Sequence, residues 1–150
     1  MEHSFVPPLA AYEVLLPGET GYVTLYLENA SGVTAGGEVS LTASLKGEAA
    51  EDTRILMRAD HIYLADNYPT FTTMTGTLSL AQEAECEMNM VYVGFYDEDG
   101  GLIGVWNFTK SAQFEGAGDT KNFTVHMRSL PIDDLAAKTA STNAVAFGFR

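Results

Sequence analysis

The sequence contains little cysteine, few basic residues and no long apolar run, and each shortage excludes a class of protein. Its single cysteine, Cys86, cannot close an internal disulfide, so the chain is not a disulfide-stapled scaffold. Eight basic residues against twenty acidic ones give a net charge of −12, which repels nucleic-acid phosphates and anionic lipids. We therefore expect no nucleic-acid partner. We also expect no direct membrane insertion, because no apolar run is long enough to cross a bilayer.

The beginning of the sequence lacks the basic segment and the apolar segment of a signal peptide. Two locations are consistent with this absence: the cytoplasm, and the outside of the cell after removal of a signal. We expect an extracellular or cell-surface protein, with the cytoplasm as the alternative.

Motifs that support catalysis are missing as well. The sequence has no Gly-x-Ser-x-Gly, His-Glu-x-x-His, Walker-type or dinucleotide-binding motif. Glu85 and Glu87 flank Cys86, and we expect their charges to raise the pKa of the thiol and weaken it as a nucleophile. We therefore predict that the protein is not an enzyme and has no catalytic residue. The groups considered for such a role are one thiol, three imidazoles and one carboxyl: Cys86, His3, His61, His126 and Asp60.

What the sequence does contain is enough apolar material for one folded domain. A chain of 150 residues, 46% of them hydrophobic, buries about 70% of the surface that its unfolded form exposes. We expect a single domain over residues 1–150, with residues 1–11 as an extended or flexible N-terminal segment. Such a domain needs no metal or disulfide to be stable.

Apolar and polar residues alternate with a period of two in several segments, which is typical of half-buried strands. Clusters of Gly, Pro, Asn and Ser bound these segments and supply the turns between them. The four clearest segments are residues 21–28, 38–46, 73–80 and 122–128. Gly76, inside the third segment, indicates a β-bulge.

Residues 87–96 are apolar on both faces, which predicts a central strand that is covered from both sides. The acidic run Asp97–Gly101 follows, and then the apolar run Leu102–Phe108. An Asp-Gly pair between two apolar runs is a strong hairpin signal. We therefore predict a hairpin around residues 97–101.

The remaining segments are less regular. Residues 54–68 fit neither a helical nor a strand period and are interpreted as one or two strands. Residues 131–138 predict a short helix, with Pro131 early and Lys138 at its end, and residues 145–149 predict a last edge strand. About seven to nine strands with one short helix predict an all-β protein, an Ig-like or jelly-roll β-sandwich.

Three motifs in the second half of the chain resemble a known family. They are Gly76–Leu80, the Val93–Gly104 run that contains Tyr96-Asp97, and Gly118–Val125 with its Phe123-Thr124-Val125. This order resembles the FxLYD-type Ig-like domains of bacterial secreted and surface proteins, in which a strand ending in Tyr-Asp turns through an acidic Gly loop. The resemblance covers a little over a third of the chain, and it implies a non-catalytic module.

Two ligand classes follow from single groups of residues. The carboxyl groups of Asp97, Glu98 and Asp99 are hard oxygen ligands that suit calcium. An acidic Asp-Gly turn is stable without a metal, so we expect no cofactor, with calcium as the alternative.

Aromatic side chains that share an exposed sheet face are typical of sugar-binding sites. For Trp106 and Tyr92 we prefer a position in the core beneath the hairpin. Tyr22 and Tyr26 are better candidates for exposure, because the other face of their strand carries the aliphatic side chains. The aromatic residues considered for a sugar site are Trp106, Tyr22, Tyr26, Tyr92, Tyr96, Tyr63 and Tyr68.

The absence of catalytic motifs, the acidity and the strand pattern favour a binding or architectural role. The leading hypothesis is an Ig-like module of an exported or cell-surface bacterial protein, acting in adhesion or partner binding. The first alternative is a carbohydrate-binding module that uses Trp106, Tyr22, Tyr26 and Tyr96. The second is an assembly protein, such as a pilus or phage component, in which an edge strand accepts a partner strand.

Overall fold

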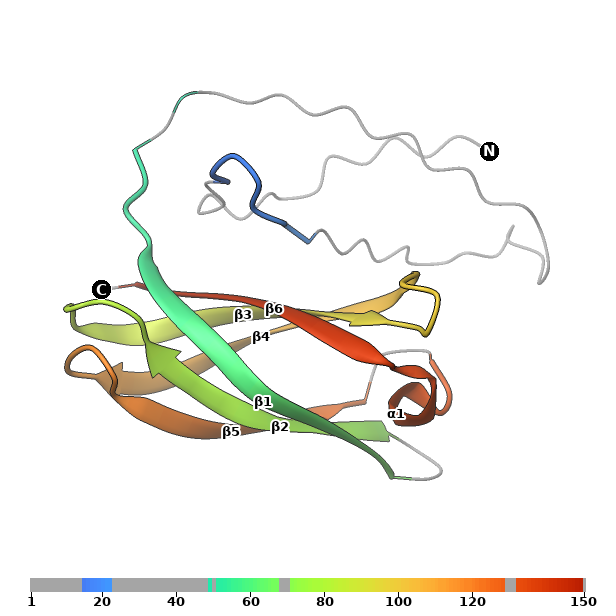
Figure 1. Cartoon of the computed structure of the whole chain (residues 1–150). Helices are drawn as coiled ribbons and strands as arrows, with labels where there is room; N and C mark the ends of the chain where they lie inside the picture. Colours follow the sequence, from blue (N-terminus) through green and yellow to red (C-terminus); the bar gives the residue numbers. More distant parts are fainter. Residues whose placement is uncertain (1–14, 23–48, 50, 68–70, 129–131, 150) are drawn as a thin grey trace, which may run out of the picture.

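The computed structural model describes residues 15–22, 49, 51–67, 71–128 and 132–149. These residues form an all-β domain, as predicted, with six antiparallel strands and one four-residue helix (Figure 1). The elements are β1 (Ile55–Asn67), β2 (Phe71–Leu80), β3 (Cys86–Tyr96), β4 (Leu102–Phe114), β5 (Thr120–Met127), α1 (Leu135–Lys138) and β6 (Ser141–Phe149).

All six strands belong to one sheet in the order β4-β3-β6-β1-β2-β5. The sheet curls until its two end strands approach each other (Figure 1). The rings of Phe108 on β4 and Phe123 on β5 lie 5.0 Å apart, and Lys110 Nζ donates a hydrogen bond to the carbonyl of Asn122. The described residues thus hold one curled sheet of six strands, and not two sheets of seven to nine strands. The strand predicted at 38–46 and most of the one at 21–28 lie outside the described residues, as do residues 1–11.

β3 is the central strand that its two-sided apolar sequence predicts. It pairs with β4 on one side and with β6 on the other. Val91, Val93 and Phe95 point into the closed inner side of the sheet and are fully buried. Tyr92, on the opposite face of the strand, is also buried.

The predicted hairpin and two of the predicted one-sided strands are confirmed. Asp97 and Gly101 close the turn between β3 and β4 through a hydrogen bond from the amide of Asp97 to the carbonyl of Gly101. In β2 and β5 the residues predicted to face inward are buried, except for the half-buried Val125, while the intervening Thr and Asn side chains face outward. The buried residues are Met74, Leu78 and Leu80 on β2, and Phe123 and Met127 on β5.

β1 is one long strand, and a β-bulge explains why its sequence fits no simple period. Its register with β2 shifts between Asp60 and Tyr63, so that His61 and Ile62 lie opposite the single residue Gly76. His61 has a positive φ of 52°, as one residue of a bulge often does. The bulge therefore lies in β1, and Gly76 is the residue that it faces.

β6 corrects the prediction of a last edge strand. It begins at Ser141 and lies inside the sheet, paired with β3 along its length and with the first residues of β1. The sequence predicted only residues 145–149 as this last strand. The strand extends back to Ser141. The apolar pattern does not reveal this first part, because it carries polar residues, including Asn143 on the outer face.

The predicted helix near 131–138 is present in shorter form as α1, Leu135–Lys138; Pro131 lies outside the described residues. Leu135 is its buried residue. The carboxylate of Asp66, at the end of β1, accepts hydrogen bonds from the amides of Ala136 and Ala137 at 3.0 and 3.2 Å. These bonds satisfy two of the amides that a helix start leaves without intrahelical partners.

Candidate functional site

The outward surface of β1, β2 and β5 is polar and ordered, and it is the strongest candidate for a binding site. In antiparallel strands, directly paired residues share a face. Tyr63, Thr75 and Thr124 are paired in sequence across the three strands, as are Ala65, Thr73 and His126. We call this surface the Thr-rich face; its residues are Tyr63, Ala65, Asn67, Phe71, Thr73, Thr75, Thr77, Asn122, Thr124 and His126.

Tyr63 is the most exposed large side chain of this face, with 69% of its surface accessible. The β-bulge puts it there. Before the bulge, Asp60 faces outward opposite Thr77; the extra residue shifts the alternation, so that Tyr63 faces outward opposite Thr75. Without the bulge, the phenol ring would point into the core.

Hydrogen bonds between side chains hold the polar groups of the Thr-rich face in place. Asn67 Nδ2 donates to Thr73 Oγ1 at 2.6 Å, and the same hydroxyl lies 3.2 Å from His126 Nδ1. His61 Nδ1 lies 3.3 Å from Thr77 Oγ1. The groups that a ligand would meet are therefore oriented before it binds, which lowers the entropy cost of association.

One end of the Thr-rich face carries a second aromatic group. The rings of Phe71 and His126 meet edge to face at a centroid distance of 5.2 Å. The guanidinium carbon of Arg128 lies 5.2 Å from the centroid of Phe71, a cation–π contact. This corner therefore combines an aromatic surface with positive charge.

The contact between Thr73 and His126 has the distance of a nucleophile and its base, but its surroundings do not support catalysis. His126 is exposed, and its ring contacts Phe71. In a hydrolytic triad a third polar group orients the base, and a closed site keeps water away. The contact between Thr73 and His126 therefore belongs to the set of polar groups that the Thr-rich face presents to a partner.

Of the aromatic residues predicted to form a sugar site, Tyr22 and Tyr96 meet on the outer side of the sheet, whereas Trp106 lies on its core side. Trp106 pairs with Val93 and packs against the core inside the sheet, which agrees with the position that we preferred for it. Tyr22 is 6% exposed, so the expectation that it faces solvent is wrong. Its hydroxyl lies 2.9 Å from that of Tyr96 on the outer side of β3, and Tyr26 lies outside the described residues.

Tyr22 belongs to a second apolar cluster, on the side of the sheet opposite the core. Its ring lies over Gly94, where an added Cβ would come within 2.6 Å of it. Asn143 Nδ2 donates a hydrogen bond to the Tyr22 hydroxyl at 2.7 Å. Burial, with the bond to Tyr96, raises the pKa of Tyr22 to about 12. We call the sheet side chains of this cluster the outer apolar face; they are Met90, Tyr92, Tyr96, Val105, Val145, Phe147 and Phe149.

The acidic turn considered for calcium is closed by its own backbone. Asp97 Oδ1 accepts hydrogen bonds from the amides of Asp99 at 3.0 Å and Gly101 at 2.7 Å. Glu98 and Asp99 are exposed. In the described ranges, acid, cysteine and histidine side chains nowhere gather in a group of three or more that could hold a metal.

The thiol and imidazoles considered for catalysis lie apart. Cys86 is 1% exposed, and its thiol donates a hydrogen bond to Asn89 Oδ1 at 3.2 Å. Burial raises the pKa of this thiol, so the direction matches the prediction while the cause is burial and not the neighbouring glutamates. Cys86 lies on the core side of the sheet, whereas His61 and His126 contact threonines on its outer side. His3 lies outside the described residues.

Comparisons with family models, with curated proteins and with solved structures gave no match. The resemblance to FxLYD-type domains therefore stays a prediction from the sequence. In the parts of the chain that the structure describes, no helix has the length and hydropathy to cross a membrane.

Sequence reasoning missed the Thr-rich face as a unit. The outward threonines of residues 73–80 and the outward polar residues of 122–128 were both visible as alternations. What the sequence does not display is that β2 and β5 are neighbours and that a bulge turns Tyr63 onto the same surface. Tyr63 itself was among the aromatic residues considered.

Proposed function

We propose that this domain is a non-catalytic binding module of an exported or cell-surface bacterial protein, and that the Thr-rich face is its contact surface. The observation that carries the proposal is the position of Tyr63. An exposed tyrosine, surrounded by oriented hydroxyl, amide and imidazole groups, offers a partner both apolar area and hydrogen bonds. Tyrosine is also enriched among the residues that dominate binding energy in interfaces.

The finer architecture that fits this role is an Ig-like β-sandwich. The six-stranded sheet supplies one part of it, and the alternating segments at 21–28 and 38–46 supply the sequence of two further strands. In modules of this kind the chain ends and loops differ from one protein to another, while a sheet face is rigid enough to bind a partner.

The test is a comparison of Tyr63→Ala with a control that removes an exposed apolar side chain elsewhere. Leu102→Ala on β4 is that control, because Leu102 is 54% exposed and lies away from the Thr-rich face. A component of a cell-surface extract is captured on the immobilised wild-type domain, purified, and titrated calorimetrically against each variant. We expect Tyr63→Ala to weaken binding at least tenfold and Leu102→Ala to leave it unchanged; equal affinities for the two variants would refute the proposal.

A glycan is the partner class that a specific observation favours as a second candidate. The Tyr63 ring lies among Thr75, Thr124 and other hydroxyl-bearing side chains, and sugar rings stack on aromatic faces while their hydroxyls bond to such groups. A glycan array of the wild-type domain and of Tyr63→Ala tests it. Binding that disappears in the variant supports the candidate, and an array without any binding removes it.

A further inference from the structure

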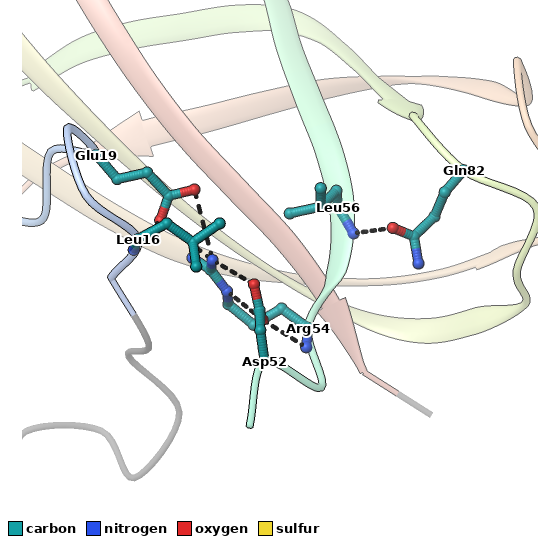
Figure 2. Close-up of polar contacts among 6 residues, drawn as sticks. All are labelled: Leu16, Glu19, Asp52, Arg54, Leu56 and Gln82. Carbon is teal, nitrogen blue, oxygen red and sulfur yellow. Dashed lines mark hydrogen bonds and ion pairs between the residues drawn. The ribbon is translucent and has the colours of Figure 1, made fainter. Parts of the chain in front are cut away.

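Most basic side chains of the described residues have a carboxylate or carbonyl partner within the protein. The guanidinium of Arg54, for example, lies 3.1 Å from Glu19 and 2.8 Å from Asp52 (Figure 2). Three ammonium groups also reach a carboxylate or a backbone carbonyl; they belong to Lys110, Lys121 and Lys138. The positive charge of these side chains is therefore already paired inside the molecule.

Two arginines remain, one at each end of the Thr-rich face. Neither Arg58 nor Arg128 forms an ion pair or a side-chain hydrogen bond in the part of the chain that the structure describes. Arg58 is paired with Ser79 and shares the outward side of the sheet. Arg128 follows the end of β5, and its guanidinium lies over the Phe71 ring. Both side chains are exposed, so their N–H groups are available to a partner.

The same side of the sheet is poor in acid, although the protein has a net charge of −12. β1, β2 and β5 contain two acidic residues, Asp60 and Asp66. The carboxylate of Asp66 accepts hydrogen bonds from the amides at the start of α1, which leaves Asp60 as the acid that faces outward on these three strands. Arg58 and Arg128 therefore make this side locally positive. Complementary charge of this kind selects an anionic partner.

Tyr63 lies midway between the two arginines. Phe71 and Ser79 are the β2 residues next to them. Thr75, which is opposite Tyr63, lies four residues from each of these two positions. At about 3.3 Å per residue, each arginine is therefore displaced from Tyr63 by about 13 Å along the strands. A partner that contacts all three side chains is an extended chain and not a small molecule.

The groups that this surface offers favour a sugar chain over a peptide. β2 is paired along its length with β1 on one side and β5 on the other, so the middle of the surface has no free backbone edge to which a peptide strand could add. The surface presents an aromatic ring, threonine hydroxyls and guanidinium groups. Sugar rings stack on aromatic rings and bond to hydroxyls, and a guanidinium binds a carboxylate through two parallel hydrogen bonds.

We infer that the partner of the Thr-rich face is a polysaccharide whose sugar units carry carboxylates, a uronate polymer. Arg58 and Arg128 each bind one of its carboxylates, and Tyr63 stacks on a sugar unit between them. The inference deepens the function proposed above and rests on it. A carboxylate on each unit lets one extended chain reach both arginines, whereas the dense phosphates of nucleic acid need more cations than two.

The first test is calorimetric titration of the full-length protein with uronate polymers. The panel is polygalacturonate, polyglucuronate and alginate, each with its methyl ester, in which the carboxylates carry no charge. We expect at least one uronate polymer to bind, its ester to bind about tenfold more weakly or less, and binding to weaken as salt screens the exposed charges. Binding to none of the polymers, or equal binding of polymer and ester, would overturn the inference.

A matched set of variants then tests the two arginines. Arg58→Gln and Arg128→Gln each remove one guanidinium, and Lys121→Gln removes the same charge from the other side of β5, where the ammonium lies beside the core residue Phe114. We expect each arginine variant to weaken uronate binding about tenfold and the lysine variant to leave it unchanged. Urea midpoints report folding, and if Arg128→Gln unfolds, Arg128→Lys replaces it, because it keeps the charge but loses the two parallel bonds. Wild-type affinity in both arginine positions would overturn the inference.

An acidic peptide is the alternative partner, and polyglutamate tests it. If polyglutamate binds through Arg128 and no uronate polymer binds, the inference is wrong. Tyr63→Ala separates this inference from the proposed function. If Tyr63→Ala weakens binding of the captured partner while no uronate polymer binds, the contact surface stands and only the uronate assignment fails. Uronate binding that Tyr63→Ala leaves unchanged would overturn both.

Discussion

At the scale of single residues, the contact between Tyr22 and Gly94 shows both what sequence reasoning predicts and where it fails. Alternation separates Tyr22 from the aliphatic side chains that follow it in the sequence, but it does not say which side of a segment is covered. The ring is buried because Gly94, on the facing strand, leaves room for it. Trp106 is half-buried and packs against the core, which agrees in part with the position preferred for it, because large aromatic side chains bury more often than they stay exposed.

Gly94→Ala is expected to destabilise the domain by about 1–3 kcal/mol, the usual cost of overpacking. The added Cβ would lie 2.6 Å from the Tyr22 ring, so the ring must move and lose its bonds to Tyr96 and Asn143. The measurement is urea unfolding of the single variants Gly94→Ala and Tyr22→Ala and of the double variant. In the Tyr22→Ala background, Gly94→Ala should be neutral or slightly stabilising, because alanine is more favourable than glycine in a strand. Additive losses would contradict this reading.

Tyr22 also predicts a loss of stability at alkaline pH. Its pKa is raised from 10.0 to about 12, by burial first and by the hydrogen bond with Tyr96 second. A raised pKa in the folded state means that the contribution is fully present below pH 10 and is lost as the pH rises toward 12. Two pKa units correspond to about 3 kcal/mol at most. Unfolding free energies measured from pH 9 to pH 12 should fall more steeply in the wild type than in Tyr22→Phe; parallel curves would refute the assignment.

At the scale of elements, periodicity predicted the regular strands. It failed where a bulge changes which residues face inward, and where a strand distant in the sequence sets the position of a strand in the sheet. β2, β3 and β5 follow their sequence patterns closely. β1 does not, because the bulge at His61 reverses the alternation partway along the strand. The inside position of β6 depends on pairing with β3 and β1, whose sequences lie far from it, so no local pattern reports it.

α1 depends on a residue that no local helix rule would identify. Its first residue follows Asp134, which has a positive φ of 55° and makes no side-chain capping bond. Asp66, on β1, takes over that role through Ala136 and Ala137 and also accepts a bond from Thr72 at 2.7 Å. The cap therefore joins the end of β1 to a helix about seventy positions later in the sequence.

Asp66→Ala is expected to cost about 1 kcal/mol of stability at neutral pH, a typical value for a lost helix cap. Burial acts to raise the pKa of Asp66, but the hydrogen bonds from Ala136, Thr72 and Ala137 outweigh it and leave the pKa below its ordinary value. A lowered pKa means that the contribution is present above about pH 4 and is lost as the pH falls further.

Urea unfolding at pH 7 and pH 3 checks this expectation. The stability difference between the wild type and Asp66→Ala should shrink at pH 3. Asp60→Asn, on the same strand, is the control that should change stability little at either pH. A difference that is as large at pH 3 as at pH 7 would show that the charge of Asp66 is not what stabilises α1.

At the scale of the whole molecule, the order of strands sets which parts are most stable. β3 and β6 are paired on both sides and lie between two apolar clusters, whereas β4 and β5 end the sheet. β4 and β5 meet through the Phe108 and Phe123 rings and the Lys110 contact. The all-β class was predictable because it depends on summed local patterns, while the curl of the sheet was not, because it depends on which strands become neighbours.

Native-state hydrogen exchange should report this order directly. We expect the amides of β3 and β6 to exchange only with global unfolding, and the amides of β4 that point away from β3 to exchange at least a hundredfold faster.

An edge strand with free amides is also where a partner strand would add, so the exchange rates of β4 also report whether another strand pairs with this edge. If the outward amides of β4 are as slow as those of β3 at low protein concentration, another segment of the chain pairs with this edge. If they become slow only as the concentration rises, the edge pairs between molecules, and the assembly role considered from the sequence gains direct support over a module that acts alone.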